Sequence, residues 1–155
     1  MATHGMWTAR LAELGLELPA VVKPVAAYVP AVRTGSHVYT SGQVPFVAGA
    51  LAATGKVGAE IGPDEAKHLA RVCALNALAA VHDLVGINSV VRVVKVVGFV
   101  ASAEGFTGQS AVINGASELL GEIFEGAGQH ARSAVGVAEL PLGAPVEVEL
   151  IVEVE

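Results

Sequence analysis

A strict alternation of aliphatic and mostly acidic residues runs through residues 146–154 and constrains the fold more than any other feature of the sequence. Its aliphatic positions are Val146, Val148, Leu150, Val152 and Val154, and glutamate fills three of the four positions between them. Successive side chains of a β-strand point to opposite faces of the sheet, so this period of two predicts a strand with one face in the core. The fold must therefore contain a sheet with other elements packed on one side.

A second alternating segment begins at Arg132 and ends at the turn formed by Leu140 and Pro141. Because this segment directly precedes residues 146–154, we expect the two segments to pair as a terminal hairpin. Arg132 and Glu147 would then lie on neighbouring strands among residues of core type. A cation and a carboxylate placed in this way are typical of a small site for an anionic substrate.

Two segments in the middle of the chain predict the longest helices. The first begins at Pro63, a residue that fits the first helical turn, and the acidic residues after it suit the positive end of the helix dipole. It ends at Gly86, and the second helix is expected over residues 112–124. Residues 89–101 between the helices are rich in valine and predict a strand that is covered on both faces.

The remaining segments are shorter. A helix is expected over residues 8–18, and residues 21–32 are interpreted as extended chain. Residues 37–41 are rich in β-branched and aromatic side chains and predict a strand, while residues 45–62 are interpreted as a loop or irregular hairpin. Helices separated by strands, with two strands at the end, indicate an α+β fold in which both helices cover one face of the sheet.

The composition favours an oligomer. The 155 residues indicate one domain, in which 53% of the residues are hydrophobic and 15% are charged. Mean hydropathy is +0.59, which suggests either a membrane protein or an oligomer that hides apolar surface. No stretch approaches the roughly 18 uninterrupted apolar residues of a membrane span. We therefore expect neighbouring subunits to cover the second face of the sheet.

Charge and cysteine usage exclude further classes. The net charge of -6 and the absence of any basic run argue against nucleic-acid binding, which needs a positive footprint. The N-terminus lacks a secretory pattern, and Cys73 stands alone in a helical segment, where a buried thiol is expected. These features predict a soluble cytoplasmic protein. The histidines lack metal-ligand spacing, so neither a metal site nor a cofactor is expected.

Three motifs, in order along the chain, resemble the reactive intermediate deaminase family, RidA, also called YjgF. They are AYVPAV at residues 27–32, YTSGQVP at 39–45, and RSAVGVAELP at 132–141 followed by VEVE at 146–149. The resemblance covers residues 22–155 and leaves residues 1–21 as an N-terminal extension with a short helix. The extension and the long Gly/Ala loop resemble a longer-chain subgroup of the family.

This resemblance implies a chorismate-mutase-like fold, with a mixed sheet and two helices on one face, assembled as a homotrimer with pockets at the subunit interfaces. It also implies hydrolysis of enamine and imine intermediates, such as 2-aminoacrylate, to 2-keto acids and ammonia without a cofactor. A second hypothesis is a trimer that binds or senses a 2-keto acid or another small carboxylate without turnover. The ribonuclease activity sometimes attributed to the family is disfavoured by the acidic charge balance.

Two residues would carry the chemistry that the resemblance implies. Arg132 matches the arginine that binds the substrate carboxylate, which a guanidinium can hold through two parallel hydrogen bonds. The alternative is a plain ion pair with Glu139 or Glu147. Glu147 matches the acidic residue that positions the attacking water and can accept its proton. The alternative is a solvated glutamate equivalent to the others on the same strand.

Four further residues would shape the cleft. Tyr28 matches a pocket tyrosine, or it packs at an interface. Gly42 matches a glycine whose backbone approaches the ligand, or it is a turn glycine required for its backbone angles. Asn114 falls near a site asparagine, and Ala134 stands where many members have cysteine but keeps its backbone groups for the ligand. His130 is either a titratable group of the site or a residue that caps the chain after the Gly-rich run.

Overall fold

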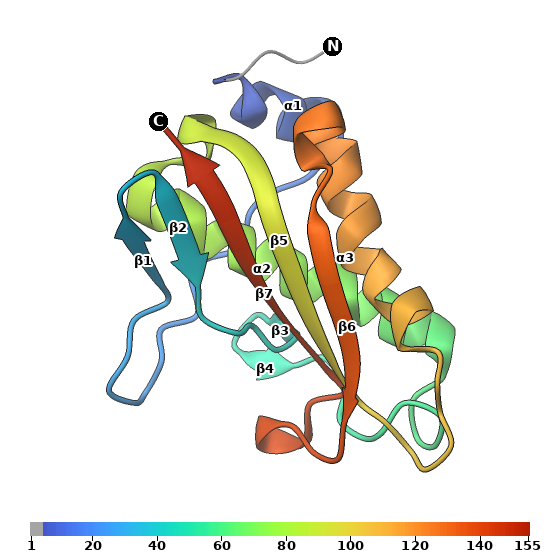
Figure 1. The fold of residues 1–155 in the computed structure, drawn as a ribbon. Helices are drawn as coiled ribbons and strands as arrows, with labels where there is room; N and C mark the ends of the chain where they lie inside the picture. Colours follow the sequence, from blue (N-terminus) through green and yellow to red (C-terminus); the bar gives the residue numbers. More distant parts are fainter. Residues whose placement is uncertain (1–4) are drawn as a thin grey trace.

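A five-stranded mixed sheet with two long helices on one face forms the body of the structure, a computed structural model that describes residues 5–155 (Figure 1). The strands lie in the order β1 (Ala31–Thr34), β2 (His37–Thr40), β7 (Val146–Val154), β5 (Val90–Ala101) and β6 (Ala131–Val137). Neighbouring strands are antiparallel except β5 and β6, which are parallel. The predicted α+β class, with both helices on one face, is confirmed.

The two long helices are α2 (Pro63–Val85) and α3 (Gln109–Phe124), and they cover what we call the inner face of the sheet. Helix α2 has the predicted bounds, and α3 begins three residues before the predicted start. The five aliphatic residues of β7 are all buried against these helices, as the alternation predicts. No helix within residues 5–155 combines the length and apolar character that crossing a membrane requires.

Helix α1 (Trp7–Glu13) is shorter than the predicted N-terminal helix. It ends early because Gly15 adopts a left-handed φ of 68°, a conformation that commonly terminates helices. Trp7 anchors α1 to the core: its indole Nε1 donates to the carbonyl of Val90 at 2.8 Å, and its ring meets the ring of Phe124 edge to face at 4.9 Å. Helix α1 therefore packs onto the same core as the rest of the described chain.

The predicted terminal hairpin is wrong. Strands β6 and β7 do not pair, because β5 lies between them and pairs with both. The connection over residues 138–145 crosses the end of β5, where Ala101 donates its amide to the carbonyl of Pro145 at 2.9 Å and Ser102 donates to Val137 at 3.0 Å. A valine-rich strand such as β5 is suited to this central place because it can be covered on both faces.

Short elements complete the chain. The segment predicted as extended overlaps β1 only in its last two residues, and β1 forms a hairpin with β2. The Gly/Ala-rich segment contains the small hairpin of β3 (Phe46–Val47) and β4 (Ala50–Leu51). Within residues 5–155, three 3-10 turns connect the larger elements; they are η1 (Ile87–Ser89), η2 (Glu125–Gly128) and η3 (Pro141–Gly143).

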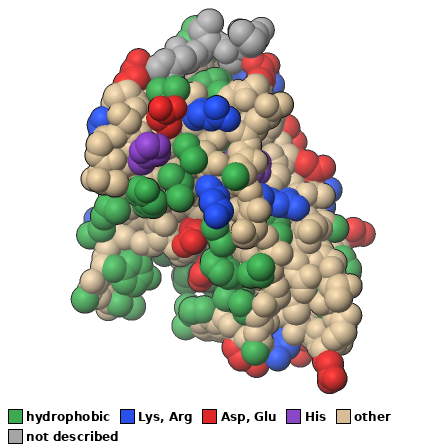
Figure 2. Space-filling model, viewed as in Figure 1, with side chains coloured by type: hydrophobic (Ala, Val, Ile, Leu, Met, Phe, Trp, Pro, Cys, Tyr) green, Lys and Arg blue, Asp and Glu red, His purple; other side chains and the backbone are tan. Residues whose placement is uncertain are grey.

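The outer face of the sheet, opposite the helices, carries several exposed apolar side chains. Val32, Tyr39 and Val135 expose 51%, 42% and 44% of their surface. Figure 2, which views this face, shows hydrophobic side chains gathered beside charged ones. The apolar character fits the prediction that neighbouring copies cover this face, and the homotrimer remains a prediction.

The closest approach of the two long helices gives a first test of the fold. A Cβ atom added to Gly115 of α3 would overlap the carbonyl oxygen of Lys67 on α2, so at least one of the two backbones must shift. Gly115→Ala is expected to lower the free energy of unfolding by about 3 kcal/mol, as overpacked core sites do. Urea denaturation measures this change.

Gly121→Ala on the same helix is the matched control, because no atom lies within 4 Å of its added Cβ. It is expected to stabilise the protein by about 0.5–1 kcal/mol through helix propensity. Equal denaturation midpoints for the two variants would show that α2 and α3 do not approach as closely as described.

Candidate functional site

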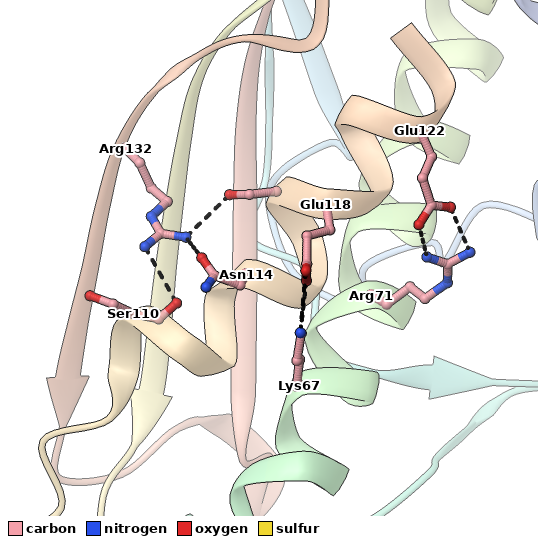
Figure 3. Close-up of polar contacts among 8 residues, drawn as sticks. Lys67, Arg71, Ser110, Asn114, Glu118, Glu122 and Arg132 are labelled. Carbon is pink, nitrogen blue, oxygen red and sulfur yellow. Dashed lines mark hydrogen bonds and ion pairs between the residues drawn. The ribbon is translucent and has the colours of Figure 1, made fainter. Parts of the chain in front are cut away.

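Arg132 lies on β6, the edge strand of the sheet, and its side chain extends over the inner face toward α3 (Figure 3). Its Nη1 donates to Oδ1 of Asn114 at 2.8 Å and to Oγ of Ser117 at 3.2 Å. Its Nη2 donates to the backbone carbonyl of Ser110 at 3.3 Å. Positions 110, 114 and 117 are spaced so that they share one face of a helix, and α3 thus builds a cradle for the guanidinium.

The alternative of a plain ion pair for Arg132 is wrong. None of the ion pairs within residues 5–155 includes Arg132, and Glu139 pairs instead with Lys56 at 3.1 Å. The guanidinium has five N–H donors. Three are used by α3, and the other two, on Nε and Nη2, have no acceptor in the described part of the chain. A carboxylate can therefore still bind to this arginine.

His130 lies beside the residues that hold Arg132 and contacts Ser117. Its Nε2 lies 2.9 Å from Oγ of Ser117, and its Nδ1 lies 2.6 Å from the carbonyl oxygen of Gly128. Neither Ser110 nor Ser117 was predicted from the sequence. The spacing of Ser117 from Asn114 on the predicted helix could have indicated it, whereas Ser110 lies before the predicted start of that helix. We call Arg132, Asn114, Ser117 and His130 the arginine cluster.

Glu147 lies on the outer face, because it alternates along β7 with the buried Val146 and Val148. Its side chain is half-buried, and this burial, together with the nearby charge of Glu149, raises the pKa of its carboxyl above the usual value. A raised pKa brings a carboxylate nearer to the range in which it accepts and returns a proton readily.

Gly42 is required by space and not by its backbone angles. It is absent from the positive-φ glycines of the structure, so the turn-glycine alternative is wrong. A Cβ at this position would lie 2.6 Å from Oε2 of Glu147. Backbone bonds in both directions between Gln43 and Val148, of 2.8 and 2.9 Å, hold the two segments together. The missing side chain thus makes room for the carboxylate of Glu147.

Tyr28 lies near the same place. It lines a small hollow of about 70 Å³ together with Gly42 and Pro30, and its side chain is exposed. Both sequence alternatives, a pocket contact and an interface contact, therefore remain predictions. We call Glu147, Gly42 and Tyr28 the glutamate cluster.

The close contact at Gly42 leads to a prediction about titration. Gly42→Ala should push the flexible end of the Glu147 side chain into solvent, so the protein still folds but the upward pKa shift of Glu147 becomes smaller. NMR titration of the Glu147 carboxyl measures the shift. Gly62→Ala, where nothing lies within 4 Å of the added Cβ, is the control and should leave it unchanged. An unaltered pKa in Gly42→Ala would contradict the described contact.

The two clusters lie on opposite faces of the sheet. Ala134 belongs to the side of Arg132, since it packs against the core beneath α3. One chain therefore brings Arg132 together with Asn114, and Glu147 together with Gly42, but it does not bring the arginine to the glutamate. A site with both groups needs a second copy of the chain.

Other candidate chemistry is limited. Cys73 is buried as predicted, and burial raises the pKa of its thiol well above the usual value, which keeps the sulfur protonated. Within residues 5–155, no group of three or more His, Cys, Asp or Glu side chains is arranged to hold a metal ion.

Comparison with known proteins places these features in a family. Residues 8–154 match the family model described as “YjgF/chorismate mutase-like, putative endoribonuclease”. Protein TCP17 of Trypanosoma cruzi is 43% identical over 157 residues, which cover 99% of this chain and 97% of that protein.

Solved structures are similar to this chain in both sequence and fold. A protein of unknown function from Agrobacterium tumefaciens is 42% identical, with a TM-score of 0.89 over 97% of this chain and 93% of its own. Escherichia coli TdcF, solved with bound serine, is 25% identical, with a TM-score of 0.64 over 87% of this chain and 94% of its own.

Proposed function

Because this chain belongs to the YjgF/chorismate mutase-like family, we propose that it hydrolyses enamine and imine intermediates of the 2-aminoacrylate type to 2-keto acids and ammonia. The observation that carries this proposal is the partly open guanidinium of Arg132, which is held by α3 and keeps two N–H donors for a ligand. A substrate carboxylate is the natural acceptor for these donors.

The reaction requires one base and one water. The enamine takes a proton from solvent on its terminal carbon and becomes an iminium ion, and the water oxygen then bonds to the iminium carbon while the C=N electron pair moves to nitrogen. Glu147 accepts the proton that water loses and passes it to this nitrogen. The C–N bond breaks as the C=O bond of the 2-keto acid forms, ammonia leaves, and the remaining hydroxyl proton goes to the carboxylate of Glu147 and then to solvent.

A neighbouring copy would complete the site. Arg132 of one subunit would bind the substrate carboxylate, and Glu147 of the next would face the imine carbon, with Tyr28 and Gly42 beside it. Two features support this arrangement: the clusters lie on opposite faces of one sheet, and the outer face that carries Glu147 also exposes apolar side chains. The backbone of Ala134 on the edge strand β6 would line the same cleft.

The test uses an enzyme that releases the intermediate. Purified protein is added to a serine or threonine dehydratase, and 2-keto acid formation is followed while the free imine is still present. We expect the rate of 2-keto acid release to rise with protein concentration. An unchanged rate across a range of protein concentrations would refute the proposed hydrolysis.

A second candidate function is binding or sensing of a small carboxylate without turnover. It is favoured by one observation: the arginine cluster is complete within one chain, whereas the glutamate is not brought to it. TdcF with bound serine is a relative that holds a small carboxylate-bearing molecule. Calorimetric titration with 2-oxobutanoate separates the two functions, since binding that depends on Arg132 with no effect on fresh imine would favour the sensor.

Ribonuclease activity is the least supported of the family's descriptions. The net charge of -6 leaves little attraction for a phosphate backbone. Labelled RNA incubated with the protein is expected to stay intact.

A further inference from the structure

We propose that Ser117 and His130 are positioning residues that fix the orientation of Arg132 through a hydrogen-bond chain with one defined direction. The proposal rests on the proposed function, because it concerns the arginine that would bind the substrate carboxylate. Neither residue is placed to touch that carboxylate first, since both act through Nη1 of Arg132.

The hydrogen-bond chain begins at the carbonyl oxygen of Gly128, which can accept a hydrogen bond but cannot donate one. Nδ1 of His130 lies 2.6 Å from it and must therefore carry a proton. In the neutral imidazole this leaves a lone pair on Nε2, which lies 2.9 Å from Oγ of Ser117. The serine hydroxyl donates to this lone pair, so the tautomer of His130 sets the direction of the serine O–H bond.

The direction of the Ser117 O–H bond determines whether its oxygen can accept a hydrogen bond from Arg132. A serine within a helix tends to donate back to a carbonyl of the preceding turn. Here the histidine takes that hydrogen, and the oxygen of Ser117 turns its lone pairs toward Nη1 of Arg132 at 3.2 Å. Both hydrogens of Nη1 are then held, one by Ser117 and one by Asn114. The rotation of the guanidinium is fixed, and the N–H of Nε and one N–H of Nη2 remain for a ligand.

The carbonyl of Gly128, where the hydrogen-bond chain starts, is itself held in place by packing. Gly128 is buried at the end of η2, and a Cβ there would overlap the carbonyl of Leu120 on α3. The Gly-rich run thus packs directly onto the helix that carries Ser117, and its carbonyl has a fixed position. The contact between Nδ1 of His130 and the Gly128 carbonyl agrees with the interpretation of His130 as a residue that caps the chain after the Gly-rich run, and a titratable role in the site stays a prediction.

The experiment measures the order of the Arg132 side chain and the tautomer of His130 without any ligand. In ¹⁵N-labelled full-length protein, the imidazole nitrogens of His130 report the tautomer, and the Nε–H signal of Arg132 reports its order. We expect the proton on Nδ1, an Nε2 shift that changes in Ser117→Ala, and a lower order parameter for Arg132 in both Ser117→Ala and His130→Asn. Ser117→Thr, which keeps the hydroxyl, is the matched control and should retain the wild-type order of Arg132.

Calorimetry with 2-oxobutanoate then measures the consequence. Loss of one hydrogen bond to a charged group should weaken binding about tenfold in Ser117→Ala and His130→Asn, with Ser117→Thr within twofold of wild type. A proton on Nε2 of His130, equal order of Arg132 in wild type and Ser117→Ala, or a Thr variant as weak as Ala overturns the proposal.

The NMR measurements need no ligand, so they distinguish failure of the positioning role of Ser117 and His130 from failure of the proposed function. If wild type does not bind 2-oxobutanoate although Arg132 loses order in Ser117→Ala, the carboxylate site is refuted and the hydrogen-bond chain is upheld.

Discussion

Replacing Arg132 with alanine is expected to lower kcat/KM for imine hydrolysis by roughly 100-fold or more. The variant loses two charge-assisted hydrogen bonds to the substrate carboxylate, each worth about 1.5–3 kcal/mol, and 1.4 kcal/mol corresponds to a factor of ten. The fold should survive, because Arg132 is half-buried and contacts only side chains and one carbonyl on the surface of α3. The dehydratase-coupled assay over a range of substrate concentrations measures the change.

Arg132→Lys separates charge from geometry. Lysine keeps the positive charge but cannot present a planar fork, so we expect it to recover only part of the lost rate. Full recovery would indicate that the substrate needs a cation and not a bidentate partner.

Arg71→Ala is the matched control for the loss of an arginine beside α3. Arg71 on α2 pairs with Glu122 of α3 at 3.3 Å (Figure 3), and both side chains are partly exposed. Such a pair contributes at most about 1 kcal/mol to stability, so kcat/KM should stay at the wild-type value. If Arg71→Ala and Arg132→Ala lost activity equally, the effect would come from disturbing α3 and not from a lost carboxylate contact.

Much of the fold could be predicted because local patterns determine it. The alternation in residues 146–154 gave the buried face of β7, and Pro63 with Gly86 marked both ends of α2. The pairing of β6 could not be predicted, since an alternating segment shows which of its faces is buried but not which strand it joins. Proximity in sequence favoured a hairpin, whereas the structure passes the chain across the end of β5.

The candidate site was predictable only in part for the same reason. The motifs indicated Arg132, Asn114 and Glu147 as candidate site residues, and the structure brings Arg132 and Asn114 into contact. Which face each one occupies depends on strand order and register, and these place Glu147 on the outer face. Gly42 was singled out for its backbone, yet its role follows from a contact with Glu147 that is distant in sequence.

The separation of the clusters onto opposite faces predicts complementation between two inactive proteins. Arg132→Ala lacks the carboxylate anchor, and Glu147→Gln lacks the base, whose removal typically costs 10²- to 10⁴-fold. Each protein alone should show roughly 1% of wild-type activity or less. If every site takes its arginine from one subunit and its glutamate from the next, mixed assemblies contain sites in which both residues are intact.

The expected recovery can be stated as a number. When equal amounts are unfolded together and reassembled, half of the subunits supply an intact arginine and half an intact glutamate, so about a quarter of the sites are restored. Each variant reassembled with the Arg132→Ala, Glu147→Gln double variant controls for refolding and should stay inactive. Activity near a quarter of wild type would mean that the site lies between copies of the chain. No recovery would mean that one chain supplies both residues, which the opposite faces of its sheet do not allow without a rearrangement of β6 or β7.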